Sequence, residues 1–108
     1  LNYPPFQKMI SFRIQSMSQE LAQQAVQLIK SRALSLQQKF PEHFNEIQIL
    51  GPAAAPLAKI KNIYRFHMII KGEKSLVLNQ FSRRILADQK WVPSKVKVIV
   101  DVDPISLL

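Results

Sequence analysis

The amino-acid sequence predicts an α+β domain: a two-layer sandwich in which a four-stranded sheet carries two helices on one face. Along the chain, hydrophobic residues repeat with a period of two or with a helical period, in the order β-α-β-β-α-β. Each predicted helix and strand also has a single apolar face. Both helices therefore bury their apolar faces on one side of the sheet, and the other side stays open.

The first half of the chain supplies one strand and the longest helix. Residues 7–15 alternate as a half-buried strand does, with Ile10, Phe12 and Ile14 on one face. Either Ser16 or Ser18 can N-cap the helix, and Gln19 stands where a capping box from Ser16 needs it. Pro41 ends the helix. Its apolar face consists of Leu21, Ala25, Leu28, Ile29, Ala33, Leu36 and Phe40.

The middle of the chain holds a proline-framed segment between two strands, which cover residues 47–49 and 64–70. Gly51 can adopt a positive φ, while Pro52 and Pro56 each restrict φ, so we expect a stiff loop. The second strand has an apolar face of Tyr64, Phe66, Met68 and Ile70. The loop and the start of that strand present three positive charges with no acid between them: Lys59, Lys61 and Arg65.

The second half of the chain predicts a cationic helix and a last strand. The helix runs from a possible cap at Ser75 to about Asp88. Its apolar stripe is formed by Val77, Leu78, Phe81 and Ile85. Residues 91–93 form a turn, residues 96–102 alternate valines with other residues as a strand, and residues 103–104 end it.

Length and composition indicate one domain over residues 1–108, with residues 1–6 as an interdomain segment. Cysteine is absent, which excludes disulfides and thiolate metal sites and fits a reducing cytoplasm. No apolar run reaches the ~18 residues that span a bilayer. Because the chain begins at Leu1 without a methionine, we expect it to be a piece of a longer protein.

Positive charge dominates the second half of the chain. The formal net charge is +8, which favours anionic partners: nucleic acid, membrane headgroups or an acidic protein tail. Between residues 59 and 97 only Glu73 and Asp88 are acidic. The basic residues of that stretch are Lys59, Lys61, Arg65, Lys71, Lys74, Arg83, Arg84, Lys90, Lys95 and Lys97.

The predicted open side of the sheet also carries positive charge, through Arg13, Arg65, His67 and Lys97. Clustered cations on one surface are typical of domains that bind phosphates. The candidate nucleic-acid-binding residues are therefore Lys59, Lys61, Arg65, Arg13 and Lys97.

Catalytic motifs are absent from the sequence. A phosphate-binding P-loop needs two glycines five residues apart, and the glycines here are Gly51 and Gly72. Asp101 and Asp103 share one strand face, but a salt bridge and ordinary turn chemistry explain them better than a metal ion. We expect His43 and His67 to be surface or partly buried structural residues. No enzymatic activity and no cofactor are therefore predicted for this chain.

Three aromatic residues can each be interpreted in two ways, as core residues or as residues on which bases stack. Tyr64 and Phe66 lie on the apolar side of their strand, so we expect them in the core. Trp91 lies at the turn between the last helix and the last strand, where packing against the core is favoured over stacking on a base or a peptide.

Four motifs in chain order resemble one protein family. They are Tyr-Pro-Pro-Phe at 3–6, Leu-Gly-Pro-Ala-Ala-Ala-Pro-Leu-Ala-Lys-Ile at 50–60, Tyr-Arg at 64–65 and Lys-Val-Lys-Val-Ile-Val-Asp-Val-Asp-Pro at 95–104. Together the motifs are similar to the C-terminal domain of the primosomal replication-restart DNA helicases, the primosomal protein N′ or PriA family. The match extends over essentially the whole chain.

The resemblance implies a non-catalytic domain at the end of a larger bacterial DNA helicase, with a fold similar to a small-subunit ribosomal protein. The ATP, magnesium and zinc of the parent family belong to modules outside this sequence. Implied partners are the branched or single-stranded DNA of stalled forks, the helicase lobes of the parent chain and the acidic C-terminal tail of single-stranded DNA-binding protein.

The family's second helix contributes to the tail-binding site, which corresponds here to residues 74–84. The resemblance therefore implies a tail-binding set of Lys74, Asn79, Arg83 and Arg84. Residues 51–61 either contact DNA or bind this domain to the helicase lobes of the parent protein. The alternative interpretation is a stand-alone ribosomal-type RNA-binding protein.

Overall fold

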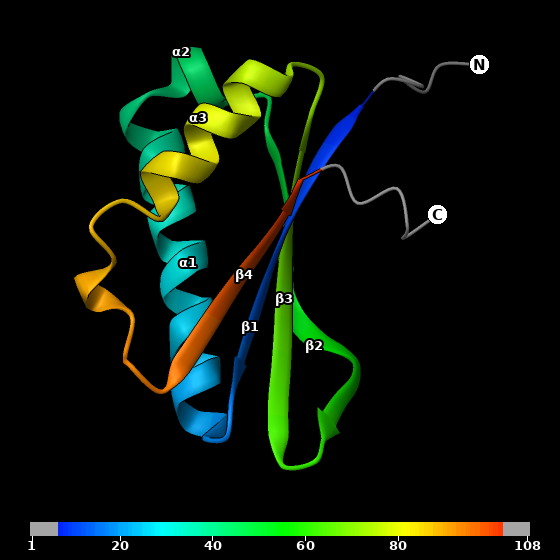
Figure 1. Cartoon of the computed structure of the whole chain (residues 1–108). Coiled ribbons are helices and arrows are strands. Elements are labelled where there is room, and N and C mark those ends of the chain that lie inside the picture. The colour runs from blue at the N-terminus through cyan, green and yellow to red at the C-terminus, as the bar shows by residue number, and fades with distance from the viewer. Residues whose placement is uncertain (1–6, 103–108) are drawn as a thin grey trace.

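The computed structural model describes residues 7–102, apart from the side chains of residues 56–58 and 89 (Figure 1). The predicted order of two helices and four strands is confirmed, and two short helical turns are added to it. The elements are β1 (Lys8–Ser16), α1 (Gln19–Lys39), α2 (Pro41–Phe44), β2 (Gln48–Ile60), β3 (Ile63–Gly72), α3 (Ser75–Ile85), the 3-10 turn η1 (Gln89–Trp91) and β4 (Val96–Val102). The predicted segment 1–6 and the predicted end at 103–104 lie outside the described residues.

The four strands form one antiparallel sheet in the order β2-β3-β1-β4. Phe12 in the centre of β1 lies opposite Met68 of β3 and Val100 of β4. Both long helices cover the same face of the sheet, as predicted (Figure 1). The two-layer α+β sandwich is therefore confirmed.

The hydrophobic core lies between the helices and the sheet. Phe12, Phe81 and Met68 are completely buried there, and the rings of Phe81 and Phe44 are 4.9 Å apart. No buried polar side-chain atom of the described residues lacks a hydrogen-bond partner. The core joins every helix and strand except the bulged end of β2, so the described elements share one hydrophobic core.

Local signals explain most element boundaries. The Oγ of Ser18 accepts a hydrogen bond from the Leu21 amide at 3.2 Å, so Ser18 is the N-cap of α1 and the predicted capping box at Ser16 is wrong. The Ser16 hydroxyl instead donates to the Lys95 carbonyl at 2.9 Å and ties β1 to the start of β4. Leu28, predicted on the buried face of α1, is exposed, whereas Val26, which was not predicted there, is buried.

The boundaries of α3 also differ from prediction. Ser75 is the first helical residue rather than the cap, and Lys74 occupies the N-cap position without a side-chain hydrogen bond. The helix ends at Ile85, before the predicted end at Asp88. Asp88 has φ 53°, a backbone conformation that an α-helix cannot contain.

The predicted stiff loop of residues 51–61 is wrong, since β2 continues through it to Ile60. Two irregularities in the register, between Leu50 and Ala53 and between Ala54 and Lys59, absorb the prolines that a regular strand excludes. Gly51 sits in the first irregularity with φ 89°, where an added Cβ would lie 3.1 Å from the His67 carbonyl oxygen. The turn itself falls at Lys61 and Asn62, both with positive φ.

Candidate nucleic-acid interface

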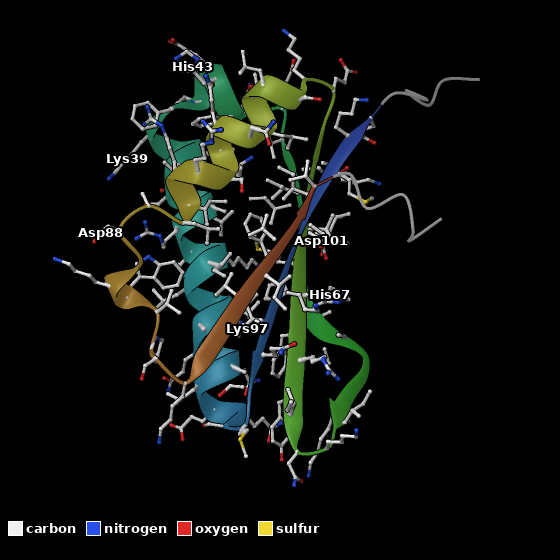
Figure 2. All side chains as sticks on the ribbon, in the orientation of Figure 1. Lys39, His43, His67, Asp88, Lys97 and Asp101 are labelled. Carbon is white, nitrogen blue, oxygen red and sulfur yellow. The ribbon has the colours of Figure 1, made fainter. Side chains whose placement is uncertain are left out.

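Four cationic or imidazole side chains share the side of the sheet that faces away from the helices. Strand alternation places Arg13, Arg65, His67 and Lys97 on this open face, as predicted. Arg13 lies directly opposite His67, and Gln15 lies between Arg65 and Lys97. The four residues therefore occupy two adjacent cross-strand rows, which we call the basic sheet patch. Figure 2 shows His67 on β3 and Lys97 on β4.

The cations of the basic sheet patch form no ion pairs with the side chains that the structure describes. Among the side chains that the structure describes, none of its cations lies within 4.0 Å of a carboxylate. Arg13 and Lys97 are exposed, and Arg65 and His67 are half-buried. Unpaired cations on a rigid sheet can bind the phosphates of a nucleic acid without first breaking an internal ion pair.

The other two predicted DNA-binding lysines lie elsewhere. Lys59 faces Tyr64 across the hairpin, so its side chain is on the helix side of the sheet, with Nζ 5.2 Å from the Tyr64 ring centroid. Lys61 lies in the turn. Tyr64 is half-buried beneath Lys59 and outside the core, so its predicted place in the core is wrong, whereas Phe66 packs against the core.

A second basic surface lies where the end of α1 and the short helix α2 meet α3. A pocket of about 460 Å³ opens here. Its lining residues are Phe40, His43, Phe44, Gln80, Arg83 and Arg84. The Arg84 guanidinium stands over the Phe40 ring at 5.0 Å, so charge and aromatic surface are already joined. We call this site the helix-end pocket; Figure 2 labels His43, which lines it, and Lys39 at the end of α1.

The residues predicted to bind an acidic tail do not all meet at the helix-end pocket. Arg83 and Arg84 line it, and the half-buried Asn79 does not. Lys74 lies about 15 Å from Arg84, given ten residues at the helical rise. It borders a different cavity of about 40 Å³, together with Glu46 and Glu73.

Phe40 was predicted on the apolar face of the first helix, which is wrong because its ring is exposed, and His43 was predicted to be a structural residue. Neither residue was connected with α3, which is about 40 residues away in the chain. The sequence feature that could have indicated this contact is Pro41, which ends α1. Where the chain turns after α1, the aromatic residue at the end of the helix can lie next to α3. Phe40 is 37% exposed, which keeps its ring available at the pocket rim.

Arg32 was also missed, and its role is structural. Its Nε donates to the Ile85 carbonyl at 2.6 Å, and one Nη donates to the Ala87 carbonyl at 3.0 Å. These carbonyls lie at and beyond the end of α3, where helical partners are missing. The guanidinium carbon also lies over the Trp91 ring, 5.0 Å from its centroid. Trp91 itself packs against the core, as predicted. Arg32 therefore joins α1, α3 and η1.

The described residues contain no cluster of three or more His, Cys, Asp or Glu side chains that could hold a metal ion. No helix in the described part of the chain is long and apolar enough to cross a membrane. What the described residues do bring together is positive charge, on the open face of the sheet and at the ends of the helices.

Fold and surface define a class: a small, basic α+β domain with a charged open sheet. The chain belongs to the family of C-terminal domains of primosomal protein N, whose family model matches residues 1–105. Its relatives include the replication restart proteins PriA of Synechocystis sp., 31% identical over 99% of this chain, and of Treponema pallidum, 32% identical over all of it. The chain spans 12% and 15% of the length of these two relatives.

Solved structures of similar fold include two de novo designed proteins. Foldit4 matches with a TM-score of 0.59 and 19% identity over 89% of this chain and 94% of its own. A design described as having a ferredoxin fold, LFR1 1, matches with a TM-score of 0.53 and 8% identity over 90% of this chain and 84% of its own. At these identities the likeness shows the fold alone.

Proposed function

We propose that this chain is a non-catalytic DNA-binding domain of a bacterial replication-restart protein, acting in the cytoplasm on branched or single-stranded DNA at stalled forks. Family membership supports the restart role, because the relatives are replication restart proteins. The basic sheet patch supports DNA binding. ATP hydrolysis, with its magnesium, and zinc binding would belong to other parts of such a protein, whose helicase lobes this domain would also contact.

The observation that carries the proposal is the set of cations on one rigid face that form no ion pair with a described residue. Arg13, Arg65 and Lys97 come from three different strands, so the sheet fixes their spacing. They would bind phosphates rather than base edges, and the resulting affinity for DNA would depend little on base sequence. A ribosomal-type RNA-binding role uses the same chemistry but has less support, since the family and its relatives are those of replication restart.

Salt dependence of binding to a forked DNA tests this proposal. With about four phosphates neutralised, the logarithm of the association constant should fall against that of salt with a slope of roughly −3 to −4. A triple variant, Arg13→Gln, Arg65→Gln and Lys97→Gln, should bring the slope to about −1. A hairpin variant, Lys59→Gln with Lys61→Gln, reports whether the turn adds contacts.

The matched control removes three charges from the helical layer, with Lys39→Gln, Lys74→Gln and Arg83→Gln. All three side chains are exposed and make no hydrogen bond to a described residue. The control should keep the slope within about one unit of the original. An equal loss in both triple variants would show that net charge alone drives binding and would overturn the patch. Absence of binding to DNA at low salt would overturn the proposal as a whole.

The helix-end pocket supports a second candidate function, a contribution to docking the acidic tail of single-stranded DNA-binding protein. Arg83 and Arg84 can pair with carboxylates, and Phe40 offers an edge to an aromatic side chain. Titration with the tail peptide should shift amide signals around the pocket. Arg83→Gln with Arg84→Gln should remove the shifts and Lys74→Gln should not; shifts centred on Lys74 instead would reject the pocket.

A further inference from the structure

The end of the β2–β3 hairpin exposes apolar surface next to positive charge. Ile60 and Ile63 pair across the turn, and strand alternation puts this pair on the open face, one row beyond Arg65 of the basic sheet patch. Ile60 is 37% exposed, Ile63 is half-buried, and Lys61 in the turn is exposed. Figure 1 shows the turn at the opposite end of the domain from α2 and α3, so neither of these helices covers it.

The helix side of the same hairpin end carries an aromatic ring. Tyr64 is half-buried and pairs with Ser16 of β1 and with Lys59 of β2, whose Nζ lies 5.2 Å from the ring centroid. Lys59 is exposed and forms no hydrogen bond or ion pair with a described residue. A cation–π contact at an exposed site is weaker than the stacking of a base on an aromatic ring, so a base can displace the lysine from Tyr64.

Apolar and aromatic side chains beside cations match the chemistry of a strand with unpaired bases. In a duplex the faces of the bases are stacked on one another, and a protein that binds without sequence preference contacts mainly phosphates. A single strand offers the same phosphates and also the faces of its bases, which stack on aromatic side chains. Phosphate contacts alone therefore do not distinguish the two forms of DNA, whereas contacts with the faces of bases do.

We propose that the end of the β2–β3 hairpin binds the unpaired bases of a DNA strand where that strand leaves the duplex bound by the basic sheet patch. This inference rests on the DNA-binding function proposed above. Tyr64 stacks on one base, and Ile60 and Ile63 contact another on the open face. Lys59 and Lys61 bind the phosphates between them. Because Tyr64 and the isoleucine pair lie on opposite sides of the hairpin, the strand passes around the turn.

Binding of a single-stranded oligonucleotide and of a blunt duplex at the same salt concentration tests the role of Tyr64. Tyr64→Thr removes the ring but keeps a residue that favours strands. The association constant for the single strand should fall about fivefold or more, and that for the duplex should change by less than about twofold. The salt dependence of single-strand binding should keep its slope, because the lost contact is uncharged. Tyr64→Phe keeps the ring and should bind the single strand within about twofold of wild type.

A second variant tests the open-face side of the hairpin end. Ile60→Thr with Ile63→Thr keeps two β-branched residues and should weaken single-strand binding by about threefold or more, again without a comparable loss for the duplex. The matched control is Leu50→Thr, because Leu50 is 38% exposed and lies on the same face of β2, at the other end of the sheet, opposite Ile69. This control should leave both association constants unchanged. Binding to the duplex also reports whether each variant is folded.

The outcomes separate the hairpin from the basic sheet patch. Tyr64→Thr that binds the single strand as well as wild type, or losses that are equal for the single strand and the duplex, would overturn the hairpin inference and leave DNA binding by the patch in place. A loss for Leu50→Thr as large as that for the isoleucine pair would also overturn it, because any exposed aliphatic residue would then serve. Absence of binding to either form of DNA at low salt would overturn the DNA-binding function itself, and this inference with it.

Discussion

The two faces of the sheet use neighbouring residues for opposite purposes. Phe12 is completely buried under the helices, while Arg13, the next residue, is exposed on the other side. The same alternation separates Phe66 from His67 on β3. One face therefore carries the stability of the domain and the other carries its unpaired charge. This division predicts that stability and DNA binding can be changed separately, one face at a time.

The largest expected effect breaks the covered face. Phe12→Ala removes a fully buried ring from the centre of β1 and should lower the free energy of unfolding by about 3–5 kcal/mol. Chemical denaturation measures this loss. The control is Arg13→Ala, at the neighbouring residue on the other face. It should change the free energy of unfolding by no more than about 0.5 kcal/mol while weakening DNA binding. A large loss of stability in the Arg13 variant would contradict the division between the faces.

The second prediction concerns a cation that belongs to the helical layer. Arg32→Met keeps an apolar stem but leaves the carbonyls of Ile85 and Ala87 without their donor. We expect the free energy of unfolding to fall by about 1.5–3 kcal/mol, the range for hydrogen bonds that involve a charged group. Thermal or chemical unfolding tests the change.

Arg83→Met is the matched control for Arg32, because the Arg83 side chain is exposed and makes no hydrogen bond with a described residue. It should change stability by less than about 0.5 kcal/mol. Equal effects of the two substitutions would show that the helical layer depends on charge in general rather than on the bonds of Arg32.

These contrasts show what the sequence could predict. Alternation in β1, β3 and β4 requires only a period of two, so the layers, the core side and the place of Arg13, Arg65, His67 and Lys97 follow from it. The course of β2 did not follow, since prolines argue against a strand and only the pairing with β3 overrides that local preference. The helix-end pocket and Arg32 depend on the packing of α3 against α1, which joins residues far apart in sequence.

A third, smaller effect lies at the start of the covering helix. Ser18→Ala removes the hydroxyl that accepts the Leu21 amide, and stability should fall by about 1 kcal/mol. Ser31→Ala, at an exposed position within α1, is the control and should be neutral or slightly stabilising, because alanine is the better helix former. If both substitutions cost the same, the cap contributes nothing beyond helix propensity.

The smallest expected effect concerns both the stability of the sheet and DNA binding by its open face. Gln15 lies between Arg65 and Lys97, so Gln15→Arg would put three cations in one row. Like charges directly opposite destabilise a sheet, and we expect a loss of about 0.5 kcal/mol. The added charge should at the same time steepen the salt dependence of DNA binding by about 0.7–0.9 in slope.

Gln23→Arg adds the same charge to the exposed surface of α1 and should change neither quantity, because that helix lies on the opposite side of the domain from the open face. If Gln15→Arg alone binds DNA more tightly and is also less stable than the wild type, then the stability of the sheet limits how closely positive charges can be placed on the open face. The neutral Gln15 would then serve that stability. A steeper slope in both variants would instead attribute DNA binding to the total charge of +8 rather than to one face.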